Sequence, residues 1–182
     1  MLVGGQTSPA LRTGRLSGQS NAVSLRMDDV IIERAPRGCL LRAECVVPRP
    51  LDEVFPFFAN AMNLERITPP LVRFRVLTPA PLTMRVGLLI DYQLRIRGLP
   101  VRWQTEITAW EPQRRFVDEQ RRGPYKFWRH EHTFEACEGG TRMTDEVHYG
   151  VPGGRLVNWL LVGRDVRKIF AYRQQALSEI FA

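Results

Sequence analysis

Apolar and polar residues alternate along most of the stretch from residue 71 to residue 149. A period of two is typical of strands that bury one face and expose the other. Turn signals interrupt the alternation at Gly98-Leu99-Pro100, Gly123-Pro124 and Gly139-Gly140, where the chain can reverse direction. The pattern predicts about six antiparallel strands joined by tight turns.

The residues before this run predict one more strand and two short helices. Residues 41–47 are rich in β-formers and end at Pro48. Apolar residues at helical spacing follow Pro50, and a second short helix is expected over residues 60–67, before Thr68-Pro69-Pro70 stops it.

The C-terminal residues 155–182 predict one long helix. Gly163 interrupts its pattern and marks a bend or a close approach of another segment. One stripe, which we expect to pack on the core, runs through Leu156, Trp159, Leu160, Val166, Ile169, Phe170, Arg173, Leu177, Ile180 and Phe181.

This order of elements indicates an α+β fold, in which a twisted antiparallel sheet wraps around the long helix. The length of 182 residues and the 44% of apolar residues suit one globular domain with room for a cavity. We assign residues 39–182 to this domain. Residues 1–38 are rich in glycine, serine and arginine and are expected to form a flexible basic tail, for which Met27 is an alternative start. The tail lacks the apolar core of a secretory signal.

Two neighbouring predicted strands carry an unusual mixture of side chains. Phe116, Asp118 and Gln120 share one face of the first strand. Trp128, His130, His132 and Phe134 share one face of the second. A ligand pocket combines apolar walls with a few fixed polar groups in this way. Asp145 and Tyr149 from the next strand, and Tyr92 and Trp103 from the preceding hairpin, are expected to join them.

Three interpretations of the polar residues remain open. His130 or His132 could act as a general acid or base beside Asp118, as ring closure with loss of water would require. The His-x-His pair with a carboxylate could hold a metal, but the signal is weak and we expect none. The third interpretation, which we favour, is a buried polar network that also anchors a ligand.

The net charge of +7 comes almost entirely from arginine, because Lys126 and Lys168 are the only lysines among 26 basic residues. Many arginines occupy alternate strand positions and predict a solvated outer face. An anionic partner, either a membrane surface or an acidic protein, is the alternative. Nucleic acid is not expected, since no binding motif is present. Three cysteines, an odd number, indicate reduced thiols and a cytoplasmic protein.

Several segments together resemble the START/polyketide cyclase superfamily (SRPBCC), in particular its bacterial cyclase/dehydrase and coenzyme Q-binding-protein-like branch. The resemblance covers about residues 40–181 and implies the helix-grip fold, with a cavity for a hydrophobic ligand under the long helix. It implies no particular reaction. The segments that carry it are Val101–Ile107, Phe116–Gln120, Gly123–Tyr125, Trp128–Phe134 and Gly140–Tyr149.

The expected function is therefore the binding, or transport, of a small hydrophobic molecule such as a lipid, a quinone or a polyketide-like compound. The alternative is a cofactor-independent cyclase or dehydratase that uses His130 or His132. Phe55, Phe58 and Met62 are expected to gate the cavity, with Trp159, Val166 and Phe170 of the long helix as its lid. The oligomeric state stays open.

Overall fold

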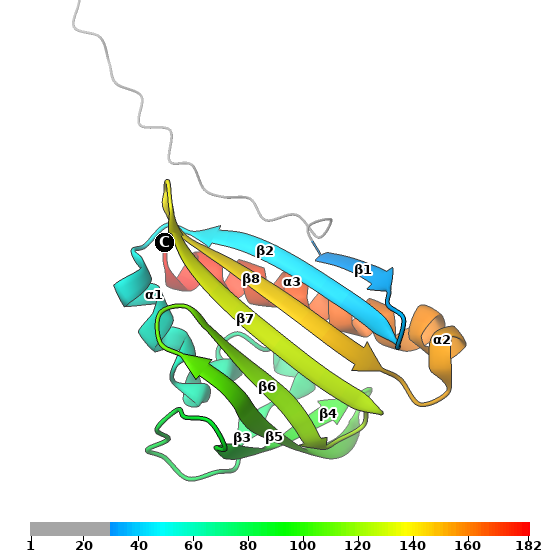
Figure 1. The fold of residues 1–182 in the computed structure, drawn as a ribbon. Helices are drawn as coiled ribbons and strands as arrows, with labels where there is room; N and C mark the ends of the chain where they lie inside the picture. The colour runs from blue at the N-terminus through cyan, green and yellow to red at the C-terminus, as the bar shows by residue number, and fades with distance from the viewer. Residues whose placement is uncertain (1–29) are drawn as a thin grey trace, which may run out of the picture.

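The computed structural model describes residues 30–182, which form one curved antiparallel sheet and a long helix (Figure 1). The eight strands lie in the order β1-β2-β8-β7-β6-β5-β4-β3. Their bounds are β1 Val30–Arg34, β2 Cys39–Val47, β3 Arg75–Val76, β4 Leu89–Ile96, β5 Leu99–Glu111, β6 Arg115–Arg122, β7 Phe127–Cys137 and β8 Gly140–Gly150.

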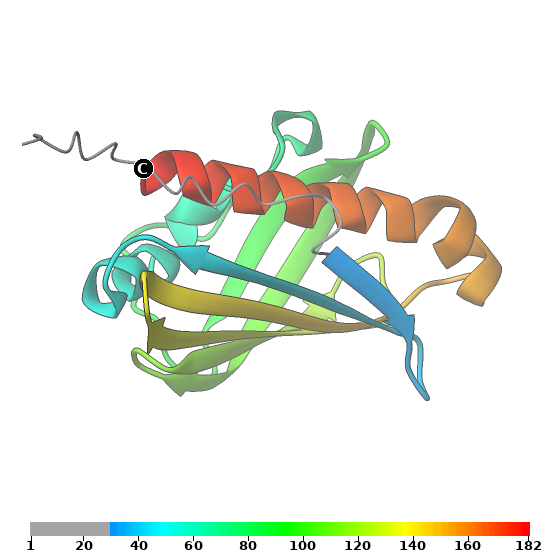
Figure 2. The same ribbon diagram turned by 90° about the horizontal axis from the view of Figure 1, so that it is seen from above.

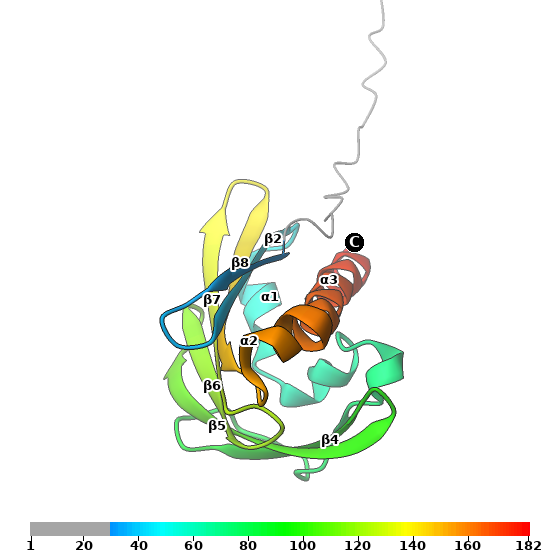
Figure 3. The ribbon, with the colours of Figure 1, turned by 90° about the vertical axis from the view of Figure 1, so that its right-hand side faces the viewer.

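The long helix crosses the concave face of the sheet, and the strands curl around it (Figures 2 and 3). Short helices close the space on the side away from β1. This arrangement confirms the predicted α+β helix-grip fold. The helical bounds are α1 Leu51–Phe58, the 3-10 turns η2 Ala61–Glu65 and η3 Pro70–Val72, then α2 Gly154–Val157, the π-helical turn η4 Asn158–Val162 and α3 Gly163–Ile180.

Alternation decides which side chains meet the helix. In β8, Met143, Asp145, Val147 and Tyr149 are buried, whereas the residues between them are partly exposed on the convex face. The buried side chains gather in three apolar clusters: one under α1, one between β2, β8 and α3, and one on β4 and β5. The space left between these clusters positions the candidate site.

The predicted strand over residues 71–77 is largely wrong. Pro70 begins a 3-10 turn there, and Arg73 adopts a left-handed backbone with φ of 45°. Both features interrupt an extended chain, so only Arg75–Val76 pairs with β4. In β5, a register shift between Ile107 and Ala109 marks an irregularity that the alternation did not reveal.

The long helix confirms the prediction for its C-terminal part and corrects it near the start. Val166, Phe170 and Leu177 are buried, as expected from the stripe. Leu156 and Trp159 are exposed instead, because α2 and η4 extend past the end of the strands (Figure 1). Gly163 ends the π-helical turn, and a side chain on it would approach the backbone oxygen of Asn158 to 3.1 Å.

The sheet begins earlier than the predicted domain boundary. β1, Val30–Arg34, pairs with β2, although its residues fall within the range assigned to the tail. The predictions for residues 1–29, including the alternative start at Met27, lie outside the described residues. None of the described helices is long and apolar enough to cross a membrane.

Candidate functional site

A cavity of about 890 Å³ lies between the concave face of the sheet, α3 and the short helices. Its walls are mainly apolar. The β4–β5 side contributes Ile90, Leu94 and Ile107, and α3 contributes Val166 and Phe170. A pocket of this size and lining can enclose most of a small organic molecule.

One wall of the cavity is polar. Asp118, His130, His132 and Arg173 form it, and Asp145 lies behind the histidines. We call these five side chains the His–Asp cluster. The Nε2 atom of His130 lies 2.7 Å from Oδ1 of Asp145, and Nε2 of His132 lies 3.0 Å from Oδ2 of Asp118. Arg173 donates to the same Asp145 oxygen over 3.3 Å. The cluster therefore contains two hydrogen-bonded His–Asp pairs.

Strand register brings these residues together. Asp118 of β6 is the partner of His130 in β7, and His132 is the partner of Asp145 in β8. Residues two apart in β7 share a face, and the two imidazole rings lie against each other with their centres 3.7 Å apart and their planes tilted by 34°. Arg173 reaches the cluster from α3, on the other side of the core.

The two histidines have shifted pKa values of opposite sign. Burial, together with the nearby His132, lowers the pKa of His130 from 6.5 to about 4. Burial acts on His132 in the same direction, but its hydrogen bond to Asp118 and the approach of Asp145 outweigh burial and raise the pKa of His132. At neutral pH His130 is therefore neutral, and His132 holds a proton more strongly than an ordinary histidine.

Both carboxylates stay ionised despite their burial. Burial alone would raise the pKa of Asp145, yet Arg173 and the two histidines hold it well below its usual range. Burial would also raise the pKa of Asp118, but His132 and His130 lower it. Arg173 is the fixed cation of the cluster, and a proton on His132, which both carboxylates favour, would balance the second carboxylate, as a buried ionic group requires.

The cluster also contains the candidate metal ligands. The ligand atoms of Asp118, His130 and His132 lie within 4.8 Å of one another, and a two-histidine, one-carboxylate set can bind a divalent ion. Both histidine Nε2 atoms, however, already bond to carboxylates. A metal would have to displace the proton that the surrounding carboxylates stabilise on His132.

Four of the predicted ligand-contacting residues line the cavity with the cluster: Tyr92, Trp103, Phe116 and Trp128. The indole nitrogen of Trp103 donates to Thr105, which also lines the cavity. The hydroxyl group of Tyr92 stays protonated, because burial raises its pKa. These side chains surround one cavity, and their contact with a ligand stays a prediction.

The structure places four predicted residues outside the lining. Gln120 exchanges two hydrogen bonds with the backbone of Tyr125 and holds the β6–β7 turn. Phe134 packs among the aromatic rings under α1. Asp145 lies behind the histidines, and Tyr149 is fully buried between β8 and α3. Alternation along each strand correctly predicts which side chains point inward. It cannot predict whether an inward side chain lines the cavity or packs in the core.

The predicted gate is also partly corrected. Phe58 lines the cavity with Val166 and Phe170, whereas Phe55 lies in the core. Met62 and Trp159 lie outside the lining of this cavity.

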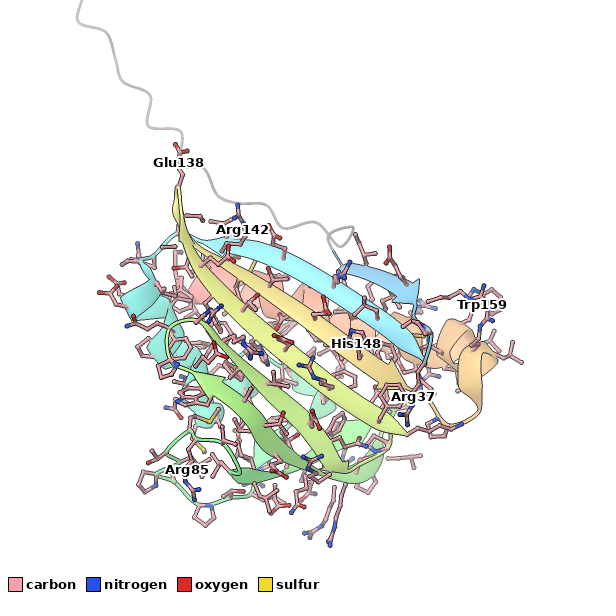
Figure 4. The ribbon with its side chains drawn as sticks, in the orientation of Figure 1. Arg37, Arg85, Glu138, Arg142, His148 and Trp159 are labelled. Atoms are coloured by element: carbon pink, nitrogen blue, oxygen red, sulfur yellow. The ribbon has the colours of Figure 1, made fainter. Side chains whose placement is uncertain are left out.

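Arg173 was missed as a site residue. It occupies a buried position within the apolar stripe of α3. A charged residue at such a position is rare without a partner, and this was the signal available in the sequence. Asp165 and Lys168 of α3 also line the cavity. His148, in contrast, lies on the convex face (Figure 4), where it contacts Glu146 over 3.1 Å.

Comparison with known families gives a clear assignment. A family described as polyketide cyclase/dehydrase and lipid transport matches residues 47–172. The chain belongs to this family. Family membership supports a role in hydrophobic-ligand binding or cyclisation in general, without showing a ligand or a reaction.

Solved structures show the same fold at low sequence identity. A protein from Chromobacterium violaceum superposes with a TM-score of 0.63 at 13% identity, covering 78% of this chain and 96% of its own. A protein from Mycobacterium smegmatis gives 0.62 at 17% identity, covering 83% and 96%. One from Thermus thermophilus gives 0.55 at 21% identity, covering 77% and 94%. The curated proteins gave no match.

Proposed function

We propose that this protein binds a small hydrophobic molecule, such as a lipid, a quinone or a polyketide-like compound, in the cavity under α3. The observation that carries the proposal is the division of the cavity into a large apolar wall and one polar wall. A purely structural cluster would be sealed from the cavity. Asp118, His130 and His132 instead form part of its lining.

The polar wall favours a ligand with a polar head. The side chain of Asp118 retains 19% of its accessible surface, and its carboxylate can accept a hydrogen bond from a hydroxyl group. His130 and His132 have little exposed surface, and the Nε2 atom of each already bonds to a carboxylate. We therefore expect the ligand to place a hydroxyl or enol at Asp118 and its apolar body against β4 and β5.

Native mass spectrometry and solvent extraction of the purified protein test this function. The expected result is an apolar molecule that leaves the protein on denaturation. Filling the cavity with Leu94→Trp should abolish retention, whereas Val86→Trp on the exposed β3–β4 loop should not. Equal ligand content in both variants, or an empty cavity after loading with a set of lipids and quinones, would refute the proposal.

A cyclase or dehydratase is the second candidate, and the opposite pKa shifts of the two histidines favour it. Two titratable groups whose environments separate their pKa values can serve as base and acid in one reaction. His130, neutral at pH 7, would accept a proton, and His132 would donate one to a leaving hydroxyl. A bound molecule that loses the mass of one water in the parent, but not in His130→Gln, would establish this activity. An unchanged ligand mass in both proteins would refute the enzymatic activity and retain only the binding function.

The cysteines support a reducing, cytoplasmic location for this binding protein. Cys39, Cys45 and Cys137 are all unpaired thiols among the described residues. Burial raises the pKa of Cys45 to about 12, so it packs as an inert apolar group.

A further inference from the structure

The arginines that β2 and β6–β8 carry on the convex sheet face are largely neutralised. Arg42 pairs with Glu146, and Arg115 with Glu131. Arg121 pairs with Glu106, and Arg129 with Glu131. This part of the face is therefore a lattice of alternating charges, whereas Arg75, Arg95 and Arg102 of β3–β5 have no ion-pair partner in the described part of the chain.

Another group of exposed cations without ion-pair partners lies at one end of the molecule. This end contains the β1–β2, β4–β5 and β6–β7 turns with α2 and η4, and it faces the viewer in Figure 3. We call it the basic end. Within residues 30–182 its acidic groups are Glu33 and Asp165, and Asp165 is already paired with Arg97. Six exposed cations there have no ion-pair partner among residues 30–182: Arg34, Arg37, Arg122, Lys126, Arg155 and Arg164.

Large apolar side chains protrude between these cations. They are the residues of the helical stripe that the core does not cover, with one more from the β4–β5 turn. Figure 4 shows Trp159 and Arg37 at this end and Glu138 at the opposite end. The exposed fractions are 76% for Trp159, 71% for Leu99, 65% for Leu156 and 53% for Leu160.

We propose that the basic end binds an anionic lipid bilayer. Arginine and lysine attract anionic headgroups, while tryptophan and leucine enter the boundary between headgroups and acyl chains. A groove beside Trp159 is lined by Arg34, Arg155, Arg164 and Arg167 together with Glu33, and guanidinium groups are well suited to hydrogen-bond phosphate. A nucleic acid would also be attracted by the charge, but it would leave the two leucines of η4, Leu160 and Leu161, in water.

The basic end lies beside an opening of the cavity, so binding to a bilayer there would bring the cavity close to the lipids. Arg97, Gly98 and Lys168 are exposed and also line the cavity, so the cavity reaches the surface beside the basic end. The Arg97–Asp165 ion pair, with 2.8 Å between Nε and Oδ2, spans this opening from the β4–β5 turn to α3. A hydrophobic molecule could therefore pass between the bilayer and the cavity with little exposure to water.

Co-sedimentation of the full chain with vesicles tests the proposal. We expect binding to vesicles of phosphatidylcholine with 30 mol% phosphatidylglycerol, at roughly neutral pH and low salt, and little binding to phosphatidylcholine alone. Arg155→Gln/Arg164→Gln should weaken the partition coefficient roughly 25-fold, at about fivefold per cation. The matched control, Arg75→Gln/Arg85→Gln, removes two exposed charges that also lack ion-pair partners among the described residues but lie away from the basic end. It should weaken the partition coefficient by less than about twofold, through longer-range attraction only.

A second pair of variants separates a bilayer from other polyanions. Trp159→Ser/Leu160→Ser should lose vesicle binding, while Leu77→Ser/Val86→Ser, at exposed positions near the opposite end, should keep it. Brominated lipids should quench the tryptophan fluorescence of the parent protein more strongly than that of Trp159→Phe. Three results would overturn the proposal: no binding of the full chain to anionic vesicles, equal effects of both variant pairs, or binding to an RNA oligonucleotide but not to vesicles.

Discussion

Different interactions stabilise the two walls of the cavity: apolar packing in one and paired buried charges in the other. The β4–β5 wall buries Ile90, Leu94 and Ile107, whose packing is non-directional and tolerates exchange for other apolar groups of similar volume. The β6–β8 wall buries two histidines and two carboxylates, which are stable only if every charge keeps its partner. One wall sets how much can be bound, and the other restricts what is bound.

The comparison predicts that equal truncations have unequal costs on the two walls. On the apolar wall a lost methylene removes transfer energy and enlarges a space that already exists. On the polar wall a lost partner leaves a buried charge uncompensated. The variants below follow this difference from the largest expected effect to the smallest.

Replacing Arg173 with Met should have the largest effect. Asp145 would lose its fixed cation at a position with 1% of its side-chain surface exposed. We expect the free energy of unfolding to fall by about 3–5 kcal/mol, measured by urea denaturation. Arg164→Met, at an exposed position of the same helix, should change it by less than about 0.5 kcal/mol.

The double variant Arg173→Met/Asp145→Asn sharpens this test. Removing both charges should recover part of the loss, because the remaining amide needs no counter-charge. If the double variant is no more stable than Arg173→Met alone, the cost comes from packing of the arginine stem and not from the ion pair.

The pH dependence of stability should separate the two histidines. His130 has its pKa lowered from 6.5 to about 4, so the unfolded chain binds a proton in this range before the native state does. Stability should therefore fall by about 3 kcal/mol as the pH drops from 6.5 to 4. In His130→Gln this slope should largely disappear, as measured by urea denaturation at several pH values.

His132 should affect the pH dependence of stability above pH 6.5, whereas His130 affects it below. Its pKa is raised by the carboxylates, so its contribution is complete below 6.5 and is lost as the pH rises through the raised value. His132→Gln should flatten stability above pH 6.5 and leave the acid slope in place. Identical pH profiles for both histidine variants would contradict the assignment of opposite shifts.

The difference between the walls also explains what the sequence could predict. Alternation placed Asp118, His130, His132 and Asp145 on in-facing rows, and the register of β6, β7 and β8 confirms that they meet. A period of two needs only local information. The helix-grip fold followed from the order of elements and the family resemblance.

Long-range geometry accounts for what was missed. Arg173 lies 28 residues from Asp145, and only packing of α3 on the sheet pairs them. Gln120 and Phe134 lie on the predicted faces, but the cavity ends before it reaches them. Trp159 continues an apolar stripe past the end of the sheet, where no strand remains to cover it.

A filling substitution on the apolar wall should reduce binding without changing the polar wall. Leu94→Trp should weaken affinity for an extracted ligand at least about tenfold, or about 1.4 kcal/mol, because the indole occupies ligand space. Its stability should keep the acid slope of the parent between pH 6.5 and 4. A loss of that slope would show that the two walls are coupled and that the comparison does not hold.

Thr105→Val should give the smallest effect. Thr105 accepts a hydrogen bond of 3.1 Å from the indole nitrogen of Trp103, and the valine keeps the volume but not the acceptor. We expect a loss of about 1 kcal/mol in unfolding free energy, measured by urea denaturation. Since Trp103 faces the cavity beside Trp128, its freed N–H could instead donate to a ligand carbonyl. Affinity for a ketone ligand should then rise relative to its alcohol, whereas an unchanged ratio would place this indole nitrogen outside ligand contact.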